Sequence, residues 1–524
     1  MTIMNEDAKN INKEEILNKA SSLIDLVETA YKAGTAAHKV EQNLFYELLK
    51  MGYMLFGYLF ILYEGSDQGK TVELSDGRTV TRLPEKHKRS YLSIFGEFDI
   101  LRWVYGSREG QKVDYIPMDK QLQLPCRKYS YLLQDWGQSL AVDLPFTEAA
   151  TIIKRIFSLS FAASGLERTV LSTSGSTSAY FDQQKESQPA EGGQIIVVSA
   201  DGKGVVIRKP AEEQVNSTEE TKPANIGQTT PKGHFGKKKM AIVGASYTID
   251  PYPRTPESVL ESLFRTRDKL AVAVSEQLRP KPVCKHVRAC MDRDEKDTLQ
   301  PARETIFSWL DQEIKQRNPE GINPVVLIMD GEKKLWEMGD EIIVDKNTVK
   351  ILDIIHASSY IWKIVEALNA DNTIQENIPI VKKYMDYLLK GEIKKAIRSF
   401  RYLATYRKIT GKRLDQIKTS CGYLENNAGR MRYDEYLAAG YPIGSGIIEG
   451  ACRHVIVDRM ERSGMRWIMT GAKAMLGLRC IYINGNWDKF MEFNIQQEQQ
   501  MINPTSAKMV NAANDDVFRQ LKVV

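Results

Sequence analysis

The sequence predicts a mixed α/β core that carries a helical insertion and follows a mainly helical region containing a small β unit. Three observations support this prediction. Strand-like runs of β-branched and aliphatic residues alternate with helical patterns between about residues 194 and 368. A basic helical stretch follows over residues 378–440. Apolar residues recur at helical spacing before residue 64, and short alternating runs occupy residues 71–106.

The composition is that of a folded protein with several domains. A chain of 524 residues is long enough for two to four domains, and 42% hydrophobic residues can bury sizeable cores. The six cysteines lack the spacing of a zinc site or a disulfide framework, which predicts reduced thiols in a cytosol. The most apolar run, residues 51–63, is shorter than the roughly 20 residues that span a bilayer. We therefore expect a buried helix there, and no membrane as a partner.

Residues 145–171 have the pattern of a helix-turn-helix. Thr147 can cap a helix that runs to about Phe157, and a second helix can begin near Ser160 or Ser164. In a helix-turn-helix, the second helix enters the major groove of DNA. An ordinary helical hairpin fits the same pattern, so both interpretations stay open.

Two polar segments separate the patterned regions. The stretch from Ser172 to about Gln194 has the composition of a linker. Residues 209–238 contain almost no core-forming residues, which predicts a disordered insertion. The expected regions are a helical one at 1–70, a β unit with the helix-turn-helix at 71–180, an α/β domain with its insertions at 194–490 and a tail at 491–524.

Two Asp-Gly dipeptides follow strand-like runs. Asp201 ends the run IIVVSA, and Asp330 ends the run PVVLIM. A carboxylate at the end of a buried strand is costly unless a cation meets it there, and the glycine leaves room for a ligand. The pair predicts a shared cation, although Asp-Gly is also a common turn dipeptide.

A third carboxylate lies in the block GSGIIEGACRHVIVDRMERSGMRW, residues 444–467. Ser445 can cap a helix that runs from Ile447 to about Ser463. Glu449 then lies in the first turn, where the helix dipole favours a negative charge. The same block is expected to carry basic residues that bind DNA phosphates, namely Arg453, Arg459, Arg462 and Arg466, the last three at helical spacings.

Carboxylates of this kind have the chemistry of a magnesium site. Mg²⁺ prefers oxygen ligands and keeps positions open for substrate phosphate. Two ions about 3.5–4 Å apart can activate a nucleophile and stabilise the leaving oxygen of an in-line displacement. We expect two Mg²⁺ ions, with Mn²⁺ as a substitute. Asp353 and His356 follow the next strand, and this accessory pair either orients a nucleic-acid strand or is a satisfied structural pair.

The insertion is strongly basic. Between Lys382 and Arg413, eleven Lys or Arg residues stand against two acids, a local charge of +9, and tyrosines are interleaved. This density predicts a surface that neutralises phosphates, although a solvated helix face is an equally good interpretation. The residues expected to contact DNA are Lys394, Lys395, Arg398 and Arg401.

The segments ADGKG, LIMDGEKKLWE and DIIH, followed by the 444–467 block, resemble the transposases of ISKra-type bacterial insertion sequences and, more remotely, Mutator-like transposases. The resemblance covers about residues 90–490. It implies an RNase H-like catalytic core with a helical insertion, a DNA-binding N-terminal region, and Asp201, Asp330 and Glu449 as metal ligands. Relatives carry cysteines near the early β unit, but none lies between Asp67 and Leu124 here, so no zinc site is predicted.

The resemblance therefore implies a DDE transposase that cleaves insertion-sequence ends and joins the freed 3′ hydroxyl to target DNA. Such an enzyme is expected to act as a homo-oligomer on terminal inverted repeats, in a bacterial cytoplasm at the nucleoid. Two alternatives stay open. An RNase H-like host nuclease would cut without joining, and a non-catalytic DNA-binding protein derived from a transposase would not use the three acids.

Overall fold

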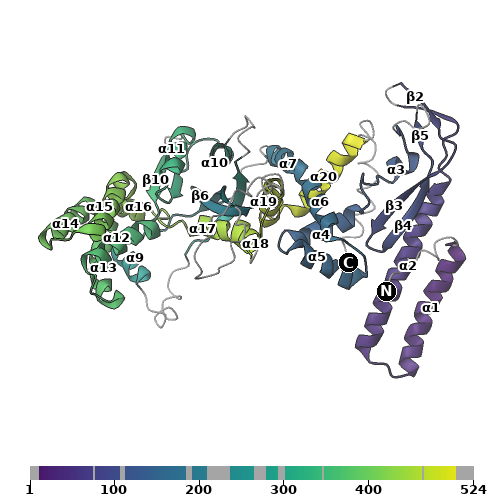
Figure 1. Cartoon of the computed structure of the whole chain (residues 1–524), viewed down its shortest axis with the longest axis horizontal. Coiled ribbons are helices and arrows are strands. Elements are labelled where there is room, and N and C mark those ends of the chain that lie inside the picture. The colour runs from purple at the N-terminus through teal and green to yellow at the C-terminus, as the bar shows by residue number, and fades with distance from the viewer. Residues whose placement is uncertain are drawn as a thin grey trace, which may run out of the picture. The chain divides into compact units, whose positions relative to one another are not determined.

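The computed structural model describes residues 11–74, 77–106, 113–184, 192–208, 237–264, 279–292, 301–344, 347–462 and 465–502. The chain divides into two compact units, whose elements are labelled in Figure 1. Unit 1 contains Met1–Tyr180 and Asn486–Val524, and unit 2 contains Phe181–Gly485. In sequence, unit 2 is thus inserted into unit 1.

Unit 1 begins with two helices, α1 (Lys13–Lys32) and α2 (Ala37–Glu64), which confirms the expected helical start. Residues 51–63 are helical, as expected, but only one side of α2 is buried. Its buried residues, Leu49, Tyr53, Gly57 and Phe60, recur every three or four positions, whereas Leu62 is 61% exposed. By length and composition alone, α2 is apolar enough to cross a membrane, and no other helix of the described residues is.

The small β unit is confirmed and consists of two sheets. The first has the order β1-β2-β5, and the second is the hairpin of β3 and β4. The run that alternates from Ser93 to Tyr105 is not one strand, because the chain turns at Gly96, whose φ of 147° suits glycine. The strand bounds are β1 Thr71–Glu73, β2 Thr79–Arg82, β3 His87–Ser93, β4 Gly96–Arg102 and β5 Tyr105–Gly106.

Four helices follow in unit 1: α3 (Pro117–Gln121), α4 (Tyr131–Ala141), α5 (Phe146–Phe157) and α6 (Ala163–Thr173). Both helices of the predicted helix-turn-helix are present as α5 and α6, and α4 packs against both. The expected cap at Thr147 is wrong, since α5 begins behind Pro145. The second helix begins at Ala163, which agrees with the expected start near Ser164. The role of these helices in DNA binding stays a prediction.

The segment expected to be a linker is helical in its first half, and the expected tail is helical in its first part. The 3₁₀ turn Ser174–Ser176 and α7 (Thr177–Gln183) lie in the segment expected to be a linker. Helix α20 (Trp487–Ile502) includes the first part of the expected tail. Helices α7 and α20 are stabilised by each other, because Tyr180 packs edge-to-face on Phe490 at 5.3 Å between ring centroids. Trp487 also donates a hydrogen bond of 2.6 Å to Asp135 on α4.

Unit 2 is built on a five-stranded sheet of order β10-β9-β6-β7-β8. The strands β6, β9 and β10 are parallel, and β7 and β8 are antiparallel to their neighbours. This order and these directions are consistent with an RNase H-like core. The bounds are β6 Ile195–Ile207, β7 Lys237–Ile249, β8 Val283–Met291, β9 Val325–Met329 and β10 Thr348–Leu352.

Both faces of this sheet are covered by helices, because alternate residues of the central strands are apolar on both sides. Ile195 and Val197 join a core with the insertion helices, and Ile196 and Val198 pack on the other side with α10 and α11. The helices are α9 Pro256–Leu263, α10 Ala302–Arg317, α11 Lys333–Ile342 and α12 Ile354–Leu368. The predicted helical insertion is confirmed as α13 Ile374–Leu389, α14 Ile393–Tyr406, α15 Gly411–Asn426 and α16 Tyr433–Ala438.

Unit 2 differs from the sequence-based prediction in two of its strands. Strand β8 was not expected, because its charged residues alternate with apolar ones and weaken the strand signal. Asp201 does not end a strand, since β6 continues to Ile207 along β7. Of the predicted disordered insertion, residues 209–236 lie outside the described residues, and Lys237 and Lys238 belong to β7.

Candidate active site at the sheet edge

Three aspartates stand at the same level of adjacent parallel strands: Asp201 lies on β6, and Asp330 and Asp353 directly follow β9 and β10. The register that pairs Val198 with Leu327 sets Asp201 level with Asp330 when it is carried three residues further. The register that pairs Met329 with Leu352 likewise sets Asp330 level with Asp353, whose N–H donates to Met329 at 2.9 Å. Since neighbouring strands are about 4.8 Å apart, the three carboxyl groups form one acidic row.

The charges in this row affect each other. Burial raises the pKa of the Asp330 carboxyl, and the nearby carboxylates of Asp201 and Asp353 raise it further. A hydrogen bond of 3.0 Å from the Glu332 N–H and the charge of His356 act in the opposite direction. Carboxylates crowded in this way are stabilised by a cation, so the row fits a divalent metal ion.

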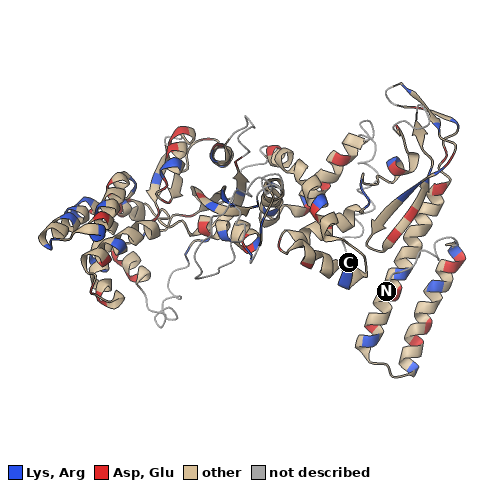
Figure 2. Ribbon diagram, viewed as in Figure 1, with Lys and Arg blue, Asp and Glu red and all other residues tan. Residues whose placement is uncertain are grey.

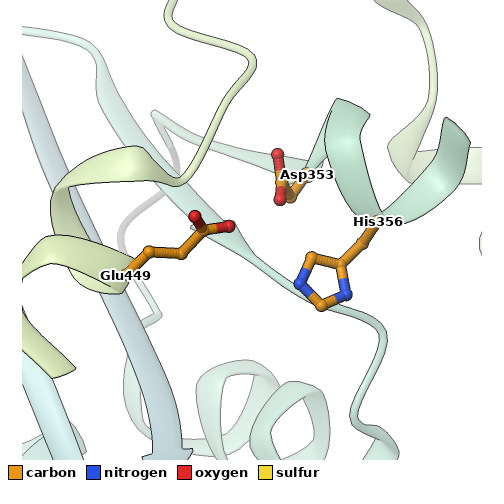
Figure 3. A group of neighbouring side chains, drawn as sticks. All are labelled: Asp353, His356 and Glu449. Carbon is orange, nitrogen blue, oxygen red and sulfur yellow. The ribbon is translucent and has the colours of Figure 1, made fainter. Parts of the chain in front are cut away.

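Glu449 reaches this site from the first turn of α17 (Gly446–Cys452), as the sequence predicted. Figure 3 shows its carboxylate turned toward Asp353 and the His356 imidazole. One ligand atom from each of these three residues lies within 4.8 Å of the other two, and no other such group of His, Cys, Asp and Glu occurs in the described residues. Asp353 and His356 are therefore placed as close to Glu449 as metal ligands would be.

Ser445 has a role that differs from the predicted cap. It occupies the N-cap position of α17, but its side chain makes no capping hydrogen bond. Its hydroxyl donates to Asp353 at 3.0 Å, and its N–H donates to the same carboxylate at 3.3 Å. The buried Asp353 carboxylate also accepts from the Ile355 N–H at 3.1 Å, so it caps α12 and fixes the start of α17 together.

Cys452 was not singled out from the sequence, although it lies one helical turn after Glu449. Its thiol donates to the Asp201 carboxylate at 3.4 Å. Burial raises the pKa of this thiol, and the negative charge of Asp201 raises it further, so it stays a neutral donor. The contact holds α17 against β6, and the helical spacing from Glu449 was the signal that could have found it.

A pair of tyrosines beside Asp330 was also missed. Tyr360 on α12 and Tyr423 on α15 stack at 3.6 Å between ring centroids. A Cβ atom at Gly331 would lie 2.1 Å from the Tyr423 hydroxyl oxygen, so any larger residue after Asp330 would force the Tyr423 ring to move. Burial raises the pKa of Tyr423, and the charges near it add to that effect. The turn that carries Asp330 is thus packed directly against the insertion.

The predicted arginine stripe does not form. The α-helix gives way to a π-helical turn (Arg453–Val457) and the short α18 (Asp458–Met460), so Arg462 and Arg466 lie beyond it. Arg459 is 0% exposed, and its guanidinium lies 4.9 Å from the centre of the Trp467 ring. Arg459 is therefore a structural residue, whereas Arg453, Arg462 and Arg466 are exposed.

The four basic residues predicted on the insertion all lie on α14 and are exposed. Two of them have acidic partners: Lys395 pairs with Glu392 at 3.0 Å, and Arg401 pairs with Glu425 at 2.5 Å. Surface pairs of this kind are weak and can be exchanged for phosphate. In the part of the chain that the structure describes, Lys394 and Arg398 have no ion pair.

No family model matches the chain, and no curated protein matches it. Among solved structures, the chain is similar to the Drosophila P element transposase strand transfer complex. The identity is 11%, the match covers 76% of this chain and 87% of that chain, and the TM-score is 0.22. A likeness at this level establishes neither a common fold nor a common activity, so the description of the core rests on its strand order and on the acidic row.

Proposed function

We propose that this chain is a DDE transposase that cleaves DNA at insertion-sequence ends and joins the freed ends to target DNA. The observation that carries the proposal is the acidic row of Asp201, Asp330 and Asp353 together with Glu449. Structural carboxylates are normally paired with Lys or Arg. Here Asp353 and His356 lie within 4.8 Å of Glu449, and the charges of Asp201 and Asp353 act on Asp330.

Asp201, Asp330 and Glu449 would hold two Mg²⁺ ions, or Mn²⁺ in their place, and bound ions would activate water and stabilise the leaving 3′ oxygen. Asp353 and His356 are near enough to complete the coordination of an ion at Glu449. The thiol of Cys452 and the hydroxyl of Ser445 hold Asp201 and Asp353 in place. The exposed Arg453, Arg462 and Arg466 would contact DNA phosphates.

The reaction has two parts of the same kind. In the first, water attacks a phosphodiester at the element end, and the bond to the 3′ oxygen breaks. In the second, that 3′ hydroxyl attacks a target phosphodiester and displaces its 3′ oxygen. We further propose that a homo-oligomer in a bacterial cytoplasm acts on two terminal inverted repeats, because both ends must be joined to one target.

The test is cleavage of a duplex that contains an element end, with Mg²⁺. Asp201→Asn, Asp330→Asn and Glu449→Gln should each abolish cleavage, because each removes a charged oxygen ligand. Glu337→Gln is the matched control, since Glu337 is an exposed acid of α11 that pairs with Lys333. Full cleavage by the three variants would rule out the proposal.

The same assay separates the alternatives. Joined products identify a transposase, and cleavage without any joining identifies an RNase H-like nuclease. Metal-independent binding without cleavage by the wild-type chain identifies a DNA-binding protein that does not use its acids.

A further inference from the structure

Helix α14 carries one row of side chains that the core does not use. Lys394, Arg398, Tyr402 and Tyr406 are spaced by four residues, so they lie along one side of the helix over about 18 Å. The opposite side is buried through Ile393, Ala396, Ile397, Phe400 and Ala404. We call the exposed side chains the tyrosine row.

The two tyrosines are presented to solvent. Tyr402 is 65% exposed and Tyr406 is 71% exposed. Their rings are nearly parallel, with 15° between the planes and 5.9 Å between the centroids. Large aromatic side chains usually bury most of their surface, and the buried side of α14 already anchors the helix. The fold therefore does not explain why two aromatic rings stand here.

The other two side chains of the tyrosine row are cations that can bind an anionic ligand. Lys394 and Arg398 have no ion pair in the described part of the chain, in contrast to Lys395 and Arg401 beside them. Figure 2 shows blue Lys and Arg residues on α14 and on the adjacent α15. A ligand for this surface must therefore offer negative charge next to flat, stackable groups.

We propose that the tyrosine row binds single-stranded DNA, with bases stacked on Tyr402 and Tyr406 and phosphates at Lys394 and Arg398. Single-stranded nucleic acid combines a charged backbone with bases whose faces are open, and aromatic stacking does not depend on sequence. A duplex hides its base faces, so tyrosines would add nothing to duplex binding. The choice of DNA rather than RNA rests on the proposed function. In that function the substrate is a DNA duplex whose strands open at the cleaved end.

The test compares a fluorescein-labelled dT20 strand with a 20-base-pair duplex, using the full chain in EDTA so that no cleavage occurs. The Tyr402→Ala, Tyr406→Ala double variant should bind dT20 roughly tenfold more weakly or worse. Its affinity for the duplex should change less than about twofold, since no base face is exposed there. Tyr→Phe at both positions should retain wild-type binding, because the ring and not the hydroxyl carries the stacking.

Two controls make the result specific. Tyr31→Ala removes another tyrosine, 87% exposed on α1, and should leave dT20 binding unchanged. The Lys394→Ala, Arg398→Ala double variant should weaken the binding of both dT20 and the duplex. For dT20, the slope of log affinity against log salt concentration should become smaller by about 1.4. Since all these side chains are exposed, the thermal unfolding of each variant should match that of the wild type.

A direct readout is photocrosslinking with dT20 in which one thymine is replaced by 5-iodouracil. Crosslinks at Tyr402 or Tyr406 are the expected result. Wild-type dT20 binding by the Tyr→Ala double variant would overturn the proposal, as would an equal loss of strand and duplex binding. Tighter binding of the rU20 strand than of dT20 would also overturn it. The two proposals can fail separately. If Asp201→Asn loses cleavage but still binds dT20, the result bears on the catalytic proposal alone, and the tyrosine row remains a binding site for single-stranded DNA.

Discussion

The hydroxyl of Ser445 donates a hydrogen bond of 3.0 Å to the buried carboxylate of Asp353. This contact joins the N-cap of α12, which is followed by His356, to the helix that carries Glu449. A backbone hydrogen bond of 2.9 Å from Ile354 to Ile443 joins the same two segments, so the relative position of two candidate ligand groups depends in part on this serine.

Ser445→Ala should lower both stability and cleavage. It removes one donor from a buried charge, which costs roughly 1–3 kcal/mol, and it frees the start of α17, so Glu449 is held less well. Urea unfolding and end cleavage measure the two effects. Ser445→Thr keeps the hydroxyl and should recover most of both, whereas wild-type behaviour of Ser445→Ala would show that the contact is unimportant.

His356→Ala should change the metal preference. Imidazole nitrogen is a better ligand for transition metals than for Mg²⁺, so the variant should lose affinity for Mn²⁺ by about tenfold or more and lose less for Mg²⁺. Mn²⁺ binding followed by electron paramagnetic resonance gives a readout that does not depend on cleavage. His454→Ala is the control, because His454 is exposed and pairs with Asp458. Equal losses for both metals would argue against a ligand role.

Gly331→Ala should disrupt the turn after Asp330. The new Cβ atom would lie 2.1 Å from the Tyr423 hydroxyl oxygen, and the stack with Tyr360 limits how far that ring can move. We expect a loss of about 1–3 kcal/mol in the free energy of unfolding. The same change in a Tyr423→Ala background should cost much less. Equal costs in the two backgrounds would contradict the packing argument.

Arg459 and Arg462 should separate stability from DNA binding. Arg459→Met should destabilise the protein by about 2 kcal/mol, because a buried cation–π contact with Trp467 is lost. Arg462→Ala should leave thermal unfolding unchanged and weaken binding to duplex DNA, with a smaller salt dependence. If the sequence-based stripe were correct, Arg459→Met would instead weaken DNA binding and leave thermal unfolding unchanged, as Arg462→Ala does.

Glu313→Gln should destabilise the protein in a pH-dependent way. Burial alone would raise the pKa of Glu313, but hydrogen bonds and charges from His286 and Arg317 outweigh it, so its pKa lies below the ordinary 4.5. The wild-type carboxylate therefore adds stability above about pH 4.5, and that stability is lost as the pH falls through the folded pKa. We expect a cost of about 3 kcal/mol at pH 7.

Chemical denaturation of Glu313→Gln and wild type at pH 7 and at decreasing pH checks this result. The two curves should converge in acid. Glu320→Gln changes an exposed acid just beyond the same helix and should differ little from wild type at any pH. A constant difference at all pH values would mean that packing, rather than charge, sets the cost.

Much of the fold could be predicted because local signals and tertiary structure agree. The apolar runs around Val197 and Val326 are long enough to read as buried strands, and the helical periods of α13 and α14 are regular. Strand β8 was not predicted, because its position at the edge of the sheet tolerates charged residues such as Lys285 and Arg288. A period of two with charges is a weak signal in a single sequence.

The candidate site was predictable in its residue types and not in its geometry. Asp201 and Asp330 could be paired because each follows a strand-like run. That Asp353 is level with both depends on the register of three strands, and no local pattern encodes that register. The arginine stripe failed because a π-helical turn shifts the phase after Cys452 and sends Arg459 into the core.

The return of the chain into unit 1 has a consequence for synthesis on the ribosome. The hydrogen bond between Trp487 and Asp135 joins residues 352 positions apart. At typical rates of translation, α4 waits about 20–70 s for α20 to emerge. The whole of Phe181–Gly485 is translated in that interval. A nascent chain can therefore assemble its acidic sheet edge before α20, the last described helix of unit 1, has been made.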